Sequence, residues 1–449
     1  METKKEGFPA AFWVCACTEI FERLAYYLGR SLILIFVTAS VATGGLGLSD
    51  TVAANMQSNL TAFSYLLPLF GAVIVDKYIG ARYTTPVGMF IAAAGYFTGG
   101  IAKSSAGVYA MIFLVSLGLA LFKNGAIIGR VITDKSQMDP AFSMRYTLVN
   151  VGAFIGTFLV GILYKDVFAK DGVLGFAPCF KMAALMMVLG GLWYIFVCWR
   201  FLGDLGKLPF KKTLTEEEKA AEAKKKEETG TKQPLTTIEK KRIGAIFVAS
   251  LFSIVFWIFW YLGYMPVYFY WAENMDWVVA GYQVPSTWFD AANSLFCVIL
   301  GPVTAALWKK LAARPQGDMS LFRKTGLGIA IIGVGYLFYA AIDIMRGGEK
   351  ASVLWLIVFA FLLTMGEMFF SPLGHSFISK YSPSRYLAVM MSVWGFATFI
   401  AAKSYGLVYG LLFGGKIEFK VACIGVAVVS FAAALIMIAL DKKLSALVD

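Results

Sequence analysis

The sequence predicts an all-α membrane protein with twelve transmembrane helices in two six-helix halves, and three observations support this prediction. Of the 449 residues, 59% are hydrophobic and only 15% are charged, and the mean hydropathy is +0.70. Apolar runs long enough to cross about 30 Å of hydrocarbon recur along the chain. The one long polar segment, residues 203–242, separates the sixth run from the seventh. This composition excludes an ordinary soluble domain.

The predicted spans follow one another with short connections. They cover residues 9–38, 52–75, 81–102, 107–132, 142–164, 178–201, 243–270, 287–308, 323–345, 352–378, 386–413 and 420–440. The fifth span contains Gly152, Gly156 and Gly161, and small residues of this kind let membrane helices approach closely.

The polar segment is rich in Glu and Lys at i,i+4 spacing and has no apolar stripe, as the run TEEEKAAEAKKKEE illustrates. We therefore expect a solvated cytoplasmic linker at 203–242. It divides the chain into an N-terminal six-helix bundle at 1–202 and a C-terminal six-helix bundle at 243–449. Two such halves around a central site are the architecture of the major facilitator fold.

Lys and Arg are concentrated in alternate loops. Lys77 and Arg82 lie between the second and third spans, whereas the loops at 39–51 and 271–286 contain neither residue type. The positive-inside rule then predicts that both termini are cytoplasmic. Because the basic residues are divided among short loops, the net charge of +12 does not indicate nucleic-acid binding.

Cysteine and histidine usage argues against metal or cofactor chemistry. Most of the six cysteines fall inside predicted spans, and the chain has a single histidine. Neither a disulfide framework nor a zinc spacing is visible. The sequence shows no clustered nucleophile and base that would indicate an enzyme. We therefore expect no metal, no cofactor and no catalytic residues.

A group of charges inside the first span is the most informative feature for function. On a helix, Glu19, Glu22, Arg23, Tyr26 and Arg30 fall on one face about 100° wide. Each charge at bilayer depth costs roughly 2.5–3.5 kcal/mol. A bundle interior or a water-filled cavity makes such a stripe tolerable, and ion and substrate pathways commonly use one.

Several motifs together resemble the proton-coupled oligopeptide transporter family of the major facilitator superfamily. Glu19-x-x-Glu22-Arg23 followed by Tyr26-Tyr27 is similar to the family's ExxER signature, and the fifth span is close to its FYxxINxG element. The other motifs stand in the family's order along the chain: Gly71-AVIV-Asp76-Lys77-YI-Gly80-A-Arg82, Lys123-Asn124, Phe142-Ser143-x-x-Tyr146-x-x-x-Asn150-x-Gly152, Trp288-Phe289-x-x-x-Asn293, Gly366-Glu367-x-x-x-Ser371-Pro372, Lys380 with Pro383, and Met390-Met391 with Trp394.

The resemblance implies a proton-coupled symporter of di-/tripeptides or peptide-like solutes that works by alternating access. It implies proton coupling through Glu19, Glu22, Arg23 and Glu367. The residues implied to bind substrate are Arg23, Tyr26, Tyr27, Tyr65, Lys123, Asn150, Trp257, Asn293, Glu367 and Trp394. The residues implied to act in gating are Arg30, Tyr261, Asp290, Asp76, Lys77 and Arg82.

The chemistry of these side chains fits the implied roles, and each has a plainer alternative. Burial disfavours the charged form of Glu22, whereas the adjacent Arg23 favours it, so movement of the arginine would change proton affinity. The alternative is a static ion pair. Lys123 and Glu367 are suited to a carboxylate and an ammonium group of a zwitterionic substrate. Alternatively they pair with each other, or Lys123 extends to the surface. For each aromatic residue the alternative is helix packing.

The sequence departs from the family at the seventh span. The family has a glutamate four residues after a tryptophan, and the resemblance implies that it pairs with the arginine at the position of Arg30. Here Trp257 is followed by Tyr261, which cannot form that ion pair. Our hypothesis is that Asp290, an acid gained on the eighth span, replaces it. Two extra helices of prokaryotic members are also missing, because the linker is too polar to supply them.

Two other functions stay open. The departure at Tyr261 is compatible with a transporter or exporter of a non-peptide metabolite with altered proton coupling. A nutrient sensor built on the transporter fold is the other alternative. The expected partners are a small-molecule substrate, protons and the lipid bilayer, without nucleic acid, and we expect a monomer. The compact size favours a bacterial cytoplasmic (inner) membrane.

Overall fold

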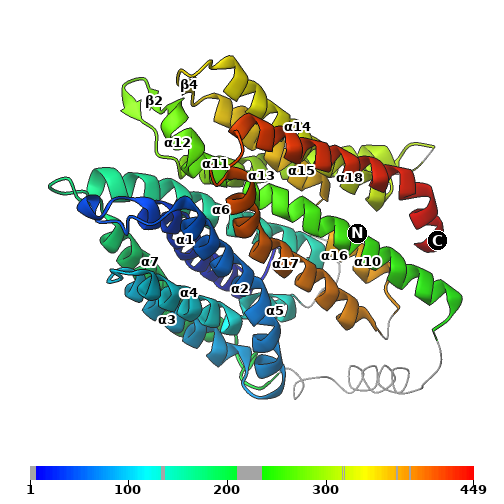
Figure 1. The fold of residues 1–449 in the computed structure, drawn as a ribbon. Helices are drawn as coiled ribbons and strands as arrows, with labels where there is room; N and C mark the ends of the chain where they lie inside the picture. The colour runs from blue at the N-terminus through cyan, green and yellow to red at the C-terminus, as the bar shows by residue number, and fades with distance from the viewer. Residues whose placement is uncertain are drawn as a thin grey trace. The chain divides into compact units, whose positions relative to one another are not determined.

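A computed structural model describes residues 7–132, 137–209, 235–315, 317, 319–370, 373–383 and 386–448 (Figure 1). The predicted linker lies outside the described residues from 210 to 234, and so does the side chain of Asp76.

The first part of the chain is helical, including two short π-helical turns, η3 and η4. Its elements are α1 (Ala10–Thr38), η1 (Val41–Thr43), α2 (Asp50–Lys77), α3 (Ala81–Gly99), α4 (Ser105–Leu121), α5 (Asn124–Val131), α6 (Met138–Ile162), η3 (Leu163–Val167), α7 (Phe176–Trp193), η4 (Tyr194–Cys198) and α8 (Trp199–Phe201).

The remainder of the chain is also helical, apart from four two-residue strands. Its elements are α10 (Thr237–Leu262), α11 (Met265–Tyr268), α12 (Tyr270–Asn274), β1 (Met275–Asp276), β2 (Val278–Val279), β3 (Tyr282–Gln283), α13 (Trp288–Ala312), α14 (Leu321–Met345), β4 (Ala351–Ser352), α15 (Trp355–Phe370), α16 (Leu373–Tyr381), α17 (Leu387–Phe413) and α18 (Phe419–Val448). β1 pairs with β4 in parallel, and β2 pairs with β3 antiparallel.

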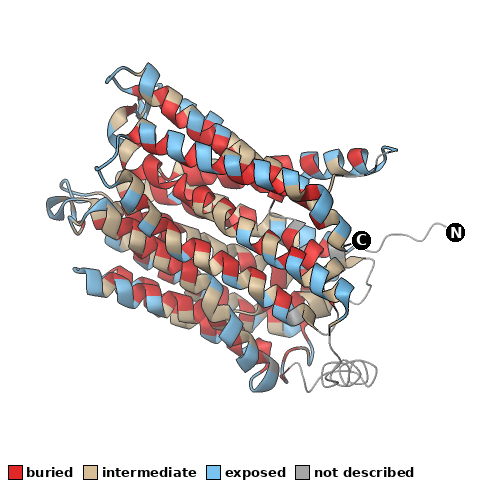
Figure 2. Ribbon diagram, turned by 45° about the vertical axis from the view of Figure 1, so that its right-hand side comes forward, coloured by how far each residue is buried: buried red, intermediate tan, exposed pale blue. Residues whose placement is uncertain are grey.

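Each predicted span coincides with a helix or with consecutive helices. In the described part of the chain, nine helical segments are long and apolar enough to cross a membrane. The other three predicted spans correspond to the charge-bearing α1, to α3, and to α15 together with α16. The helices carry exposed apolar side chains that suit contact with lipid. On α18, Val421, Val428 and Leu435 are exposed, whereas Ala427 and Ala434 are buried (Figure 2).

Two details of the helices differ from the predicted spans. The fourth span is interrupted after Leu121, because Phe122 has an extended backbone (ψ 102°) and Lys123 precedes the new helix α5. The seventh span begins at Thr237, earlier than residue 243. Thr236 and Glu239 form a capping box there, and such a polar first turn is invisible to hydropathy.

The contacts divide the chain into two compact units. Unit 1 contains Met1–Ser49 and Leu66–Leu214, and unit 2 contains Asp50–Tyr65 and Thr215–Asp449. Helix α2 therefore belongs partly to each. Its Asp50–Tyr65 part packs with α17 inside unit 2, where Ser58 Oγ donates to the Ala402 carbonyl at 2.8 Å. The division of the chain into two bundles and a linker at 202 and 243 stays a prediction.

Close helix contacts in unit 1 depend on the glycines of α6, as expected from the sequence. A Cβ added at Gly152 would lie 2.8 Å from the Ile20 carbonyl oxygen, and one at Gly156 would lie 2.5 Å from the Leu24 carbonyl oxygen. Both contacts are made with α1. These glycines therefore bring α6 against the charge-bearing part of α1.

We expect the substitution Gly156→Leu to destabilise the protein by about 1–3 kcal/mol, because overpacking forces backbone to move. Thermal unfolding of the purified protein in detergent measures this loss. Gly425→Leu on α18 is the matched control, since nothing lies within 4 Å of a Cβ added there. Equal stability of the two variants would show that the α1–α6 approach is not needed.

Candidate functional site

The charged face of α1 is buried in unit 1. Glu22 is 1% exposed, and Arg23 donates to both of its carboxylate oxygens through Nε and Nη2. This bidentate arrangement is the strongest geometry available to an arginine and a carboxylate. The Arg23 guanidinium also lies 4.6 Å from the centre of the Tyr26 ring. The predicted stripe therefore faces the protein interior.

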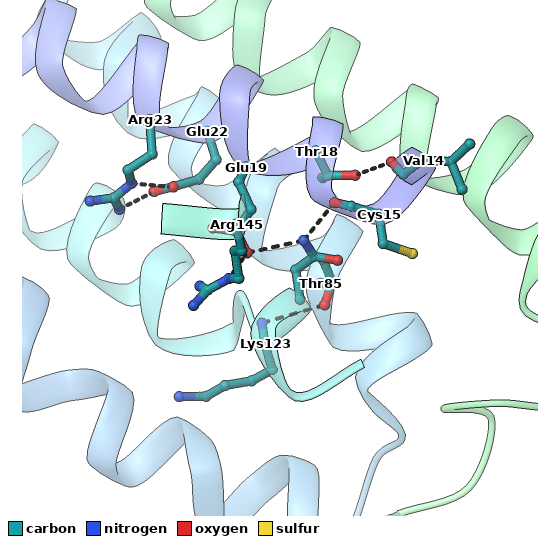
Figure 3. A network of polar contacts seen from close by, with 10 residues as sticks. Val14, Cys15, Thr18, Glu19, Glu22, Arg23, Thr85, Lys123 and Arg145 are labelled. Carbon is teal, nitrogen blue, oxygen red and sulfur yellow. Dashed lines mark hydrogen bonds and ion pairs between the residues drawn. The ribbon is translucent and has the colours of Figure 1, made fainter. Parts of the chain in front are cut away.

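One turn earlier on α1, Glu19 is the centre of a second polar network (Figure 3). Its Oε1 accepts hydrogen bonds from Arg145 Nε on α6 and from Asn124 Nδ2 at the start of α5, both at 3.0 Å. Asn124 Nδ2 also donates to the Cys15 carbonyl at 2.8 Å. Glu19 is thus bound to two elements besides its own helix.

Lys123 occupies the break between α4 and α5. Its ammonium donates to the Pro68 carbonyl on α2 at 2.7 Å, and its backbone N–H donates to Thr85 Oγ1 at 3.4 Å. The interrupted helix thereby holds a cation beside the Glu19 network in Figure 3, where the Lys123 ammonium and the Arg145 guanidinium point to the same side.

Other residues implied to act in unit 1 follow the same face of α1 or pack near it. Arg30 is 5% exposed, and its guanidinium carbon lies 5.9 Å from the centre of the Tyr27 ring. Tyr26 and Tyr27 contact each other edge to face at 5.4 Å. Asn150 Nδ2 donates to the Tyr146 carbonyl at 3.0 Å within α6.

The gating residues at the α2–α3 turn differ in their surroundings. Lys77 is exposed at the end of α2. Arg82 is buried and donates to the Trp199 carbonyl at 2.9 Å and to the Gly203 carbonyl. Its guanidinium also lies 5.0 Å from the centre of the Trp199 ring. Arg82 therefore fixes the start of α8 and the segment after it to α3.

In unit 2 a carboxylate is buried among uncharged polar groups. Glu367 on α15 is 8% exposed and accepts from Asn293 Nδ2 on α13 at 3.3 Å. Asn293 also donates to Thr364 Oγ1 at 2.8 Å, and Cys297 Sγ lies 3.8 Å from the Glu367 carboxylate. The sequence predicted Glu367 and Asn293 for the site but not Thr364 or Cys297.

Aromatic side chains of unit 2 form a continuous group. Phe370 stacks on Trp394 at 5.6 Å and contacts Trp257 at 6.0 Å. Gly374 makes room for Trp394, because a Cβ there would lie 2.1 Å from its ring. Trp257 and Trp394 thus belong to one aromatic surface, joined by Phe370.

The position where the family has glutamate is occupied by hydrogen-bonded tyrosines. Tyr261 donates from its hydroxyl to that of Tyr65 at 3.2 Å and stacks on Tyr405 at 5.1 Å. Asp290 is 6% exposed and accepts a hydrogen bond from Tyr268 on α11. The sequence did not predict Tyr268 as a contact of Asp290, and the pairing of Asp290 with Arg30 stays a hypothesis.

Arg145 is the functional candidate that sequence reasoning missed most clearly. The sequence predicted no role for Arg145 in the site. A signal was available, because Arg145 takes the place of the phenylalanine in the FYxxINxG pattern, directly before Tyr146. An arginine in an element that otherwise reads as apolar is a candidate partner for a buried carboxylate.

The arrangement suits recognition and ion movement more than bond-making chemistry. Within the described ranges, no group of three or more His, Cys, Asp or Glu side chains could hold a metal ion. Each unit instead holds a buried, hydrogen-bonded carboxylate, which is Glu22 in unit 1 and Glu367 in unit 2. The membrane-spanning helices define the class of protein, which is a polytopic membrane protein with buried charged clusters.

Comparisons with known proteins agree with this class. The structure of a peptide transporter POT in complex with sulfate matches with a TM-score of 0.87 at 22% identity, covering 99% of this chain and 98% of that one. A POT family transporter in complex with 5-aminolevulinic acid matches with a TM-score of 0.85 at 23% identity, covering 98% of both chains. The predicted fold of twelve transmembrane helices in two six-helix halves is confirmed.

The sequence comparisons point to the same family as the structural ones. The model of the POT family matches residues 204–420. An uncharacterised transporter of Bacillus subtilis is 25% identical, with 89% of this chain and 87% of that protein covered. A di-/tripeptide transporter of Lactococcus lactis subsp. cremoris is 24% identical, with 86% of each chain covered. Residues 204–420 are thus similar to the POT family, and the chain is a transporter rather than an enzyme.

Proposed function

We propose that this protein is a proton-coupled symporter of di- and tripeptides or peptide-like solutes that works by alternating access. The observation that carries the proposal is the bidentate Glu22–Arg23 pair, buried on one face of an otherwise apolar helix. The match of residues 204–420 to the POT family model and the similarity to a di-/tripeptide transporter of Lactococcus lactis support it.

The pair gives a direct route to coupling. A proton on Glu22 removes the negative charge that holds Arg23, so the guanidinium becomes available to a carboxylate of the substrate. Binding of the substrate to Arg23 in turn favours the protonated form of Glu22. Protonation of Glu22 and binding of the substrate to Arg23 therefore favour each other, and this coupling links the two in symport.

Glu367 is suited to the opposite end of a zwitterionic substrate. Its carboxylate is held by the uncharged donors Asn293 and Cys297, and no cationic side chain among the described residues is within salt-bridge distance of it. A buried carboxylate of this kind gains a great deal from a cation. We propose that it binds the ammonium group of the peptide.

The test is uptake of Ala-Ala and Ala-Ala-Ala into proteoliposomes, with and without an imposed proton gradient. Each coupled proton contributes about 1.4 kcal/mol per pH unit of gradient, which corresponds to roughly tenfold accumulation. We expect accumulation above the external concentration only with the gradient. Folded protein that takes up neither peptide would contradict the proposed substrate class.

One observation favours a second candidate, a non-peptide metabolite as substrate. Tyr261 forms a hydrogen bond to Tyr65 where the family has a charged gating residue. A solved POT family transporter of the same fold binds 5-aminolevulinic acid. Uptake of 5-aminolevulinic acid in the assay above, without uptake of peptides, would favour this candidate.

Asp290 provides a prediction about gating. If it replaces the missing glutamate, Asp290→Asn should reduce gradient-driven uptake and flatten its dependence on pH. Tyr268→Phe is the matched variant, because it removes the hydrogen bond to Asp290 but keeps the charge. Unchanged pH-dependent transport in Asp290→Asn would remove Asp290 from the gate.

Location and assembly can be proposed from the distribution of charge along the chain. We propose that the protein lies in a bacterial cytoplasmic (inner) membrane. Because Lys and Arg are concentrated in alternate loops, we place those loops and both termini on the cytoplasmic side. We further propose that the protein works as a monomer embedded in lipid.

A further inference from the structure

The guanidinium of Arg145 is only partly used by the network around Glu19. Its Nε donates to Glu19 Oε1 at 3.0 Å. Arginine carries five N–H donors in a planar fork. Among the described residues no further hydrogen bond or ion pair engages its two terminal amino groups. The Arg145 side chain is 30% exposed, whereas that of Glu19 is 3% exposed. The terminal amino groups are therefore accessible while the Nε side is anchored.

The position of Arg145 is set by packing as well as by its ion pair. A Cβ added at Gly125, in the first turn of α5, would lie 3.0 Å from both Cζ and Nη2 of Arg145. The guanidinium thus lies against backbone that has no side chain. Because Glu19 and Gly125 fix it on two sides, the fork is preorganised, and little side-chain entropy remains to be lost on binding a ligand.

The surroundings of Arg145 are rich in positive charge. Arg145 is paired with Glu19, which lies one helical turn from Glu22 on α1. Figure 3 draws Arg23, Lys123 and Arg145 together with the carboxylates Glu19 and Glu22.

We propose that Arg145 is a specificity-determining residue that binds a second carboxylate of the substrate, so that the transporter favours peptides with an acidic side chain. The inference rests on the proposed function. Arg23 and Lys123 are suited to bind the terminal carboxylate that every peptide carries. Arg145 binds the side-chain carboxylate that only acidic peptides carry. Its planar fork matches a carboxylate with two parallel hydrogen bonds.

The test compares two nearly isosteric peptides, Ala-Glu and Ala-Gln, as inhibitors of labelled Ala-Ala uptake into proteoliposomes. Since a hydrogen bond to a charged group is worth about tenfold or more in affinity, we expect Ala-Glu to inhibit wild type at about one tenth of the Ala-Gln concentration. In Arg145→Gln the ratio should fall to about one, and in Arg145→Lys it should be intermediate. Arg200→Gln, at an exposed arginine of α8, is the control and should keep the ratio.

The ratio separates recognition from a purely structural role of Arg145. If Arg145 only holds Glu19 in place, Arg145→Gln weakens the binding of Ala-Glu and Ala-Gln equally and leaves the ratio of their inhibitory concentrations unchanged. This result would overturn the inference. A wild-type ratio near one would also overturn it, whether or not the variants fold. If wild type transports Ala-Ala but does not distinguish the two inhibitors, the inference fails and the proposed function stands. If wild type takes up no peptide, both fail.

Discussion

Replacing Glu22 with glutamine is expected to abolish gradient-driven accumulation of peptide while peptide exchange across the membrane continues. Glutamine keeps the shape of the side chain and can accept a hydrogen bond from Arg23, but it cannot lose a proton. The variant therefore resembles the protonated form of Glu22 permanently. With a gradient of one pH unit, wild type should accumulate Ala-Ala about tenfold for each coupled proton, and Glu22→Gln should not accumulate it.

Exchange of labelled for unlabelled Ala-Ala without a gradient is the necessary companion measurement, because it reports a folded and moving transporter. Glu418→Gln is the matched control, since Glu418 is an exposed carboxylate paired with Lys420 at 3.0 Å. This control should behave like wild type. Accumulation by Glu22→Gln at the wild-type level would mean that the Glu22–Arg23 pair is a static element of helix packing.

Replacing Glu367 with glutamine is expected to remove recognition of the peptide ammonium group. Truncating one partner of a buried charge pair costs about 2–5 kcal/mol, so the affinity for Ala-Ala should fall by about 30-fold or more. The amide of glutamine retains hydrogen bonding to Asn293, so the loss reports charge more than packing. Competition against labelled Ala-Ala in exchange mode measures it.

N-acetyl-Ala-Ala makes this prediction specific to one group of the ligand. Acetylation removes the ammonium, so wild type should bind the acetylated peptide much more weakly than Ala-Ala. The Glu367→Gln variant should bind the two with similar affinity, because the two changes remove the same interaction. If acetylation weakens binding equally in both proteins, the ammonium group is bound somewhere else.

The positions of the membrane-spanning helices were predictable because hydropathy reads a property of single segments. A run of apolar residues must be helical inside lipid, so all twelve spans could be located from the sequence. What hydropathy could not locate were interruptions and polar ends. The break at Lys123 depends on the backbone of Phe122 and on a contact with Pro68, which lies on another helix. The polar first turn of α10 depends on its capping box.

The candidate site was predictable as one face of α1 but not as contacts between helices. The periodicity of α1 placed Glu19, Glu22 and Arg23 on one face. It contained no information about the register of α6, and that register brings Arg145 to Glu19. The register follows from the approach of Gly152 and Gly156 to α1, which only the packed helices reveal. Similarly, Tyr268 reaches Asp290 because the seventh span continues beyond Leu262 into α11.

The most direct test of the account is the movement of protons during peptide transport. Purified protein is placed in liposomes that contain a pH-sensitive dye, and Ala-Ala is added outside in the absence of any other gradient. We predict that the lumen acidifies as the peptide enters, and that the acidification is lost in Glu22→Gln. Entry of Ala-Ala into the liposomes without acidification of the lumen would contradict proton-coupled symport.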